Sequence, residues 1–195
     1  MKIVVLNGSP RRGGNTELMV DSFIKGATEQ GHEVHKVNLG EKKVAPCLAC
    51  EYCFSHDGVC IQKDDMKEVL ELTDGADMIV FASPIYWFTV SAQLKAAIDR
   101  LYARARKGFT IRYAALMLDS MSDGVYKSAI DAYEDTCNYL GWKSKGVLHP
   151  WFWLWPLSCP LFLEEEGIWR PPGDGLLGKG GQRQIILEAF YDGRN

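Results

Sequence analysis

Four cysteines lie close together in the first third of the chain, in the pattern C-x2-C-x2-C-x6-C, at Cys47, Cys50, Cys53 and Cys60. Cysteine thiolates are the ligands of iron–sulfur clusters, and two consecutive x2 spacings allow one loop to wrap three corners of a cluster. Cys60 would supply the fourth corner, since no second cysteine run follows it. The pattern favours a [4Fe–4S] cluster over structural zinc, because zinc sites usually pair two separated CxxC knuckles. A loop of free thiols without metal is the remaining alternative.

A second polar stretch, KIVVLNGSPRRGGNT over residues 2–16, joins a strand pattern to a glycine-rich loop. Its apolar run predicts a strand buried on both faces, and Asn15 or Thr16 is expected to cap the helix that follows. The first N–H groups of a helix lack internal partners and attract anions. The loop lacks the Walker lysine and the GxGxxG pattern. Its side chains nevertheless add donors suited to a phosphate: Ser9, Arg11, Arg12, Asn15 and Thr16.

An alternation of strands and helices is expected to position these groups. Apolar runs predict strands over residues 2–6, 33–39, 77–82, 112–118 and 143–148. Helical spacing predicts helices over 17–30, 64–72 and 91–104, and a further helix that Ser122 or Asp123 caps and that runs to residue 140. Residues 40–63 show no periodicity and are interpreted as an inserted loop. The order predicts an α/β protein with a doubly wound parallel sheet, in which ligands bind outside the carboxyl ends of the strands.

Three motifs, in this order, resemble the flavodoxin-like, NAD(P)H-dependent FMN reductase family. They are GSPRRGGNT (8–16), CLACEYCFSHDGVCIQKDDM (47–66) and SPIYWFTVSAQLKAAIDR (83–100). The cysteine motif resembles the branch of the family called iron–sulfur flavoproteins. The resemblance implies a flavodoxin-like fold with five parallel strands in the order 2-1-3-4-5 and helices on both faces. Residues 1–149 would form the FMN-binding domain, with 40–63 as its inserted cysteine loop.

The same resemblance implies where FMN binds. The first loop would hold the ribityl phosphate, and the loop after the third strand would meet the flavin ring mainly through its backbone. The residues of that second loop are Pro84, Ile85, Tyr86, Trp87 and Phe88. An aromatic loop packed into a subunit interface is an alternative interpretation that is compatible with the first. A third contact loop is expected after the fourth strand, with Asp119 and Ser120.

The function implied by the resemblance is that of an FMN-dependent oxidoreductase. Electrons would pass from NAD(P)H, or from a reduced ferredoxin, through FMN to a small acceptor such as a quinone or flavin, with a [4Fe–4S] cluster as a second cofactor. Because the flavin carries the chemistry, no catalytic side chain is required. A non-enzymatic electron carrier and a redox sensor are the alternative functions. The resemblance also implies a homodimer or tetramer.

The composition sets further bounds. The chain has 195 residues, enough for one well-cored domain, and a net charge of −3, which argues against nucleic acid or anionic membrane as a partner. No apolar run approaches the roughly 20 residues of a membrane span, and no signal-peptide pattern opens the chain. We therefore expect a cytoplasmic protein, whose thiols are kept reduced. Cys137 and Cys159 are expected to be buried small hydrophobes.

Residues 150–195 depart from the family pattern. Four of the six tryptophans fall within 151–169, and five prolines exclude a continuous helix across the region. Only residues 182–191 are predicted to be helical. Three interpretations are open: an aromatic lid or an arm exchanged between subunits, a loosely ordered extension, and a change of reading frame near residue 150.

Overall fold

The structure is a computed structural model that describes residues 1–105 and 107–149. The predictions for 150–195 and for Cys159 lie outside these residues. The strands are β1 (Lys2–Asn7), β2 (Glu33–Asn38), β3 (Met78–Tyr86), β4 (Thr89–Val90), β5 (Tyr113–Asp119) and β6 (Lys143–Leu148). The helices are α1 (Asn15–Glu29), α2 (Tyr52–Ser55), α3 (Met66–Thr73), α4 (Ala92–Ala105) and α5 (Lys127–Leu140), with a 3-10 turn η1 (Leu39–Glu41).

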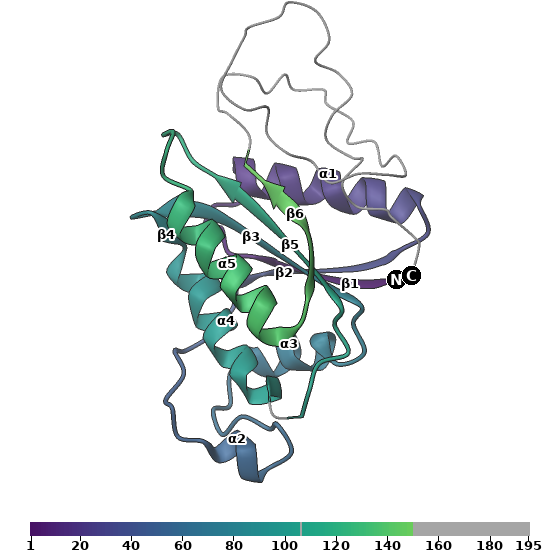
Figure 1. The fold of residues 1–195 in the computed structure, drawn as a ribbon, viewed down its shortest axis with the longest axis vertical. Helices are drawn as coiled ribbons and strands as arrows, with labels where there is room; N and C mark the ends of the chain where they lie inside the picture. The colour runs from purple at the N-terminus through teal and green to yellow at the C-terminus, as the bar shows by residue number, and fades with distance from the viewer. Residues whose placement is uncertain (106, 150–195) are drawn as a thin grey trace, which may run out of the picture.

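Five parallel strands form the centre of the molecule in the order β2-β1-β3-β5-β6. This confirms the predicted doubly wound sheet, since β5 and β6 are the fourth and fifth predicted strands. The short β4 was not predicted, and it pairs antiparallel with the end of β3. Helix α1 lies on one face of the sheet, and α3, α4 and α5 lie on the other (Figure 1).

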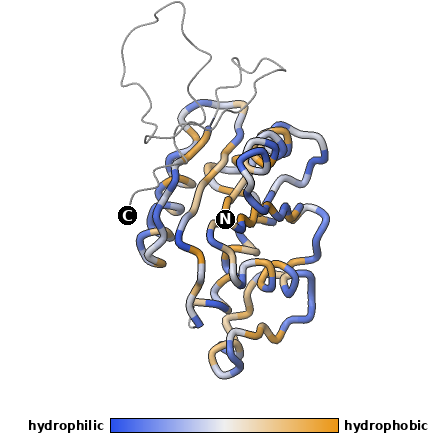
Figure 2. Tube along the Cα trace, turned by 90° about the vertical axis from the view of Figure 1, so that its right-hand side faces the viewer, coloured by the Kyte–Doolittle hydropathy of each residue, from blue (hydrophilic) through white to orange (hydrophobic). Residues whose placement is uncertain are grey.

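The central strands are apolar along their whole length because both of their faces are covered. In β1, Val4 and Leu6 belong to the core beneath α3, α4 and α5, whereas Ile3 and Val5 belong to the core beneath α1. Hydrophilic segments lie mainly on the outside of the trace and hydrophobic ones run through its middle (Figure 2). No helix among the described residues is long and apolar enough to cross a membrane.

Four differences from the predicted elements bear on the candidate sites, while the other boundaries agree to within two residues. Strand β3 runs on to Tyr86, so most of the predicted loop after the third strand is extended, with Pro84 in register with Asp119 of β5. Helix α1 begins at Asn15 with Gly14 as its N-cap, so neither Asn15 nor Thr16 is the cap.

Helix α5 begins at Lys127 rather than near residue 122, because the chain turns at Gly124 with a φ of 70° before the helix starts. The predicted structureless stretch 40–63 contains the one-turn helix α2 and part of η1. Three of these differences fall in segments without clear apolar periodicity, where the pattern carries little information. The fourth is the continuation of β3 through residues 83–86, which follow the apolar run directly.

Candidate functional site

The loops that follow β1 and β3 are bonded directly to each other at the carboxyl edge of the sheet. Gly8 N–H donates to the Ala82 carbonyl at 2.8 Å. The Ser91 hydroxyl, buried at the start of α4, donates to the Gly8 carbonyl at 2.7 Å, and Ser91 N–H donates to the Ser83 hydroxyl at 2.8 Å. The two segments predicted to bind one ligand are therefore held side by side on a rigid base.

The loop between β1 and α1 is shaped mainly by its own polar groups. Asn7 Oδ1 accepts from Ser9 N–H at 3.1 Å, and the Ser9 hydroxyl accepts from Arg11 N–H at 3.2 Å. Ser9 is buried, while Arg11 and Arg12 are exposed. The hydroxyl of Ser9 thus fixes the loop, and the first-turn N–H groups of α1 are the groups suited to an anion, with the exposed Arg11 and Arg12 in the same loop.

Asp119, at the end of β5, connects the third predicted contact loop to the first. Burial raises the pKa of its carboxyl, against the opposing effects of a hydrogen bond with the Asn15 side chain and the positive charge of Arg11. Ser120 follows directly. The structure thus brings the three predicted loops to one edge of the sheet, and their contact with FMN stays a prediction.

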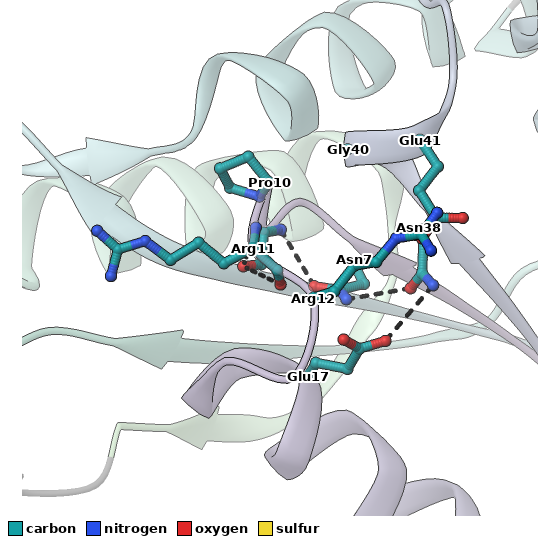
Figure 3. Close-up of a pocket in the computed structure, with 9 residues that line it drawn as sticks. Asn7, Pro10, Arg11, Arg12, Glu17, Asn38, Gly40 and Glu41 are labelled. Carbon is teal, nitrogen blue, oxygen red and sulfur yellow. Dashed lines mark hydrogen bonds and ion pairs between the residues drawn. The ribbon is translucent and has the colours of Figure 1, made fainter.

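A polar recess of about 270 Å³ opens on the β2 side of the first loop. Figure 3 shows Asn7, Asn38 and Glu17 joined by hydrogen bonds along its floor, with Arg11 extending away from them. Hydrogen bonds from Lys36 and from Gly13 N–H lower the pKa of Glu17.

Of the residues that line this recess, Ser9, Arg11 and Arg12 were predicted as phosphate donors, whereas Asn7, Glu17 and Asn38 were missed. Asn7 and Asn38 are register partners at the carboxyl ends of β1 and β2, and a polar residue closing each of two apolar strands was the available signal. Arg12 closes the rim through an ion pair with Glu41 at 2.9 Å.

The β3–β4 turn presents aromatic side chains to the outside. Trp87 and Phe88 have φ values of 48° and 65°, the left-handed region that non-glycine residues seldom adopt. Trp87 is 92% exposed, and Tyr86 and Phe88 are also exposed. Strained backbone in exposed aromatic residues is typical of a segment selected for contact with a ligand or another protein.

The four cysteines of the inserted loop line one pocket. Cys47 and Cys50 are exposed, Cys53 and Cys60 are half-buried, and all four are free thiols. Among the described residues, no group of His, Cys, Asp or Glu has the spacing that holds a single metal ion. The described residues thus show no preformed metal site at the cysteines, and the cluster stays a prediction that rests on their number and spacing in the sequence.

The backbone of the cysteine loop is irregular. Ala49 and Glu51 have positive φ values, so the backbone curls between the cysteines, and Ala49 N–H donates to Cys47 Sγ at 3.4 Å. Burial raises the pKa of the Cys53 thiol, with the other three cysteines adding to the effect. Cys137 is buried in α5, as predicted, away from this loop.

Two arginines of α4 contact the cysteine loop, and sequence reasoning assigned neither of them a role. Arg100 donates to Cys60 Sγ at 3.3 Å, and Arg104 donates to the Gly58 carbonyl. Both are buried and both are paired with aspartates. Figure 1 shows that the loop, with its short helix α2, lies at the end of the molecule away from α1.

Comparisons with known proteins agree with this geometry. Residues 1–146 match the sequence profile of the NADPH-dependent FMN reductases. An iron–sulfur flavoprotein of Methanosarcina thermophila is 37% identical over 138 residues, which are 69% of this chain and 72% of that protein. An iron–sulfur flavoprotein of Archaeoglobus fulgidus is 42% identical over 101 residues, 52% of this chain. The aligned part is 46% of that relative, so the match spans under half of its length.

Among solved structures, a NAD(P)H:quinone oxidoreductase from Methanothermobacter marburgensis superposes with a TM-score of 0.63. The match covers 81% of this chain and 86% of that one, at 22% identity. At that identity the likeness concerns the fold, which is flavodoxin-like.

Proposed function

Because the chain belongs to the NADPH-dependent FMN reductase family, we propose that it is an FMN-dependent oxidoreductase that uses NAD(P)H and passes electrons to a small acceptor such as a quinone or flavin. We further propose that its cysteine loop holds a [4Fe–4S] cluster. The observation that carries the proposal is the meeting of three loops at the carboxyl edge of the sheet, combined with four cysteines around one pocket.

The residues at the carboxyl edge would bind and orient FMN. The first-turn N–H groups of α1, with Arg11 and Arg12 beside them, suit a dianionic phosphate. The exposed rings of Tyr86, Trp87 and Phe88 offer a flat apolar wall for the isoalloxazine. The bonds that join Gly8 to Ser91 would fix the spacing between phosphate and ring.

The cysteine loop would hold the cluster through Cys47, Cys50, Cys53 and Cys60. The donor set fits in number and chemistry, and N–H groups already point at two of the four sulfurs. When bound, FMN supplies two-electron exchange with a nicotinamide, and a [4Fe–4S] cluster supplies one-electron exchange with a ferredoxin or with the flavin. The two names "iron–sulfur flavoprotein" among the relatives support this assignment.

The test is an anaerobic purification of the full chain, followed by its visible spectrum and assays of FMN, iron and sulfide. We expect about four iron and four sulfide per chain, as a [4Fe–4S] cluster requires, together with bound FMN. Cys53→Ser should lose iron and keep FMN, whereas Cys137→Ala, which changes a buried cysteine outside the loop, should keep both. Iron unchanged in Cys53→Ser, or absent from the wild type, would overturn the cluster assignment. Absence of flavin after FMN is added would overturn the whole proposal.

Steady-state kinetics separates the enzyme from the alternative functions. A reductase oxidises NADH or NADPH in the presence of a quinone, with turnover that saturates in both substrates. A pure carrier binds FMN without oxidising either nicotinamide. A redox sensor would change its thiol titre on exposure to air at full FMN occupancy.

A further inference from the structure

Arg100 lies deep between α4 and the cysteine loop. Its side chain is completely buried, which is rare for arginine unless its charge is paired. It is paired with Asp64: Nη1 lies 2.6 Å from Oδ2 and Nη2 lies 2.9 Å from Oδ1. This two-pronged contact fixes the plane of the guanidinium.

The same guanidinium joins the two ends of the cysteine loop. Nη1 also donates to the Ala45 carbonyl at 3.0 Å, just before Cys47, and Nη2 donates to Cys60 Sγ at 3.3 Å. Asp64 completes the clamp by accepting from Ala45 N–H at 3.0 Å. The burial of Asp64 is the largest single effect and acts against its ionisation, but the hydrogen bonds from Arg100 and Ala45 N–H, together with the charge of Arg100, outweigh it and lower the pKa of the carboxyl.

We propose that Arg100 is a positioning residue that donates a hydrogen bond to the Cys60 sulfur and raises the reduction potential of the cluster held by the loop. This inference rests on the cluster assignment in the proposed function. Reduction adds negative charge to a cluster and its thiolates, and a hydrogen-bond donor at a ligand sulfur stabilises the more negative state. Buried from water and pinned by Asp64, the donor keeps its direction in both redox states.

A purely structural clamp is the competing explanation, and the chain offers a matched control for it. Arg104 lies one turn further along α4 and is also buried. It also makes a two-pronged contact with an aspartate, through Nε at 2.9 Å and Nη2 at 3.0 Å from Asp74, and it donates to the cysteine loop. Its loop partner is the Gly58 carbonyl, and no cysteine sulfur accepts from it within the described residues.

The experiment compares Arg100→Gln, Arg100→Lys and Arg104→Lys with the wild type, all as anaerobic holoproteins. Iron per chain shows whether the cluster is present, and a redox titration of the cluster signal gives its midpoint potential. In Arg100→Lys the positive charge still pairs with Asp64, but lysine lacks the second guanidinium nitrogen that donates to Cys60 Sγ. We expect both Arg100 variants to shift the ratio of reduced to oxidised cluster about tenfold toward the oxidised form, which is about 59 mV for one electron. Arg104→Lys should stay at the wild-type value.

Each outcome decides between the explanations. Equal potentials in the wild type and the iron-loaded Arg100 variants overturn the inference, and so does an equal shift in Arg104→Lys, which would indicate general loosening of the loop. If Arg100→Gln loses its iron, the midpoint potential of the cluster in Arg100→Lys decides between the two explanations. Wild-type protein without iron overturns the cluster assignment and the inference together, whereas iron with an unchanged potential overturns the inference alone.

Discussion

At the scale of single residues, Asp119 is the carboxylate whose ionisation the candidate flavin site disfavours. Burial raises the pKa of its carboxyl above the ordinary value of 3.8, and its contacts with Asn15 and Arg11 only partly offset this effect. Between the ordinary and the raised pKa, the folded protein therefore binds more protons than the unfolded chain. In that window stability falls as the pH rises, and above the raised pKa the loss is constant.

Asp119→Asn should remove this penalty while its amide oxygen still faces Asn15. Without flavin, we expect the variant to become more stable relative to the wild type as the pH rises above about 4, the ordinary aspartate range, and the difference to level off at higher pH. Urea unfolding of both proteins from pH 4 to pH 8 measures it. Asp123→Asn, at an exposed carboxylate in the following turn, is the control for removing one negative charge from the same surface. A difference that does not change with pH would contradict the assignment of Asp119 as a penalised carboxylate.

The sequence indicated which residue types could do chemistry, but it did not indicate which of them the fold employs internally. Ser9 was predicted as a phosphate donor, and its hydroxyl is engaged with Arg11 in the loop. Arg100 was included in a predicted helix and in the motif 83–100, but no role was assigned to it. Its role depends on Asp64 and Cys60, which are 36 and 40 residues away in the sequence. Spacing along a chain does not reveal such contacts.

At the scale of elements, apolar runs predicted the five parallel strands, because a strand covered on both faces must be apolar throughout, and the family resemblance implied their order in the sheet. The missed boundaries lie at the site itself. Pro84 led to the prediction that a loop begins after residue 82, but β3 continues through it. A proline is tolerated near the end of a strand, where its missing N–H donor is not needed. The cap of α1 is Gly14, which leaves Asn15 inside the helix, where its side chain meets Asp119.

The docking of the cysteine loop on α4 depends on Gly58. Its φ is +76°, and a Cβ there would lie 2.8 Å from the Ala103 carbonyl oxygen, so the backbone would have to move. We expect Gly58→Ala to destabilise the protein by more than the roughly 1–2 kcal/mol that left-handed backbone costs an L-residue, and to lower its iron content. Urea unfolding and an iron assay measure the two effects.

Gly75→Ala is the matched control for this substitution. Its φ is +77°, almost the same, but no atom lies within 4 Å of the added Cβ. It should show the backbone penalty alone and retain iron. Equal losses of stability and iron in both variants would mean that contact between Gly58 and α4 does not hold the loop.

At the scale of the whole molecule, the candidate flavin site and the cysteine loop lie in two different regions of the fold. The carboxyl edge of the sheet gathers the three candidate flavin loops, while the cysteine loop packs against α4 on the face opposite α1 (Figure 1). Helix α4 joins the two regions, because Ser91 at its start is bonded to Gly8 in the loop after β1, and Arg100, between two and three turns later, is bonded to Cys60. The parallel topology made the meeting of the three candidate flavin loops predictable from sequence, since the carboxyl ends of parallel strands share one edge of the sheet. The packing of the cysteine loop against α4 was not predictable, because the loop has no periodicity that places it on either face of the sheet.

Binding at the carboxyl edge should stabilise the whole fold, since a ligand held only by the native state shifts the unfolding equilibrium. At a free FMN concentration 100 times its Kd, the expected gain is about 2.7 kcal/mol, which for a chain of this size raises Tm by about 5–10 °C. Riboflavin carries the same ring without the phosphate and is the control ligand. If the first-turn N–H groups of α1 bind the phosphate, riboflavin at the same concentration should raise Tm much less, because those groups stay unpaired. Equal shifts for the two ligands in protein freed of flavin would mean that the ring alone supplies the affinity, and the anion site would then have to serve another ligand.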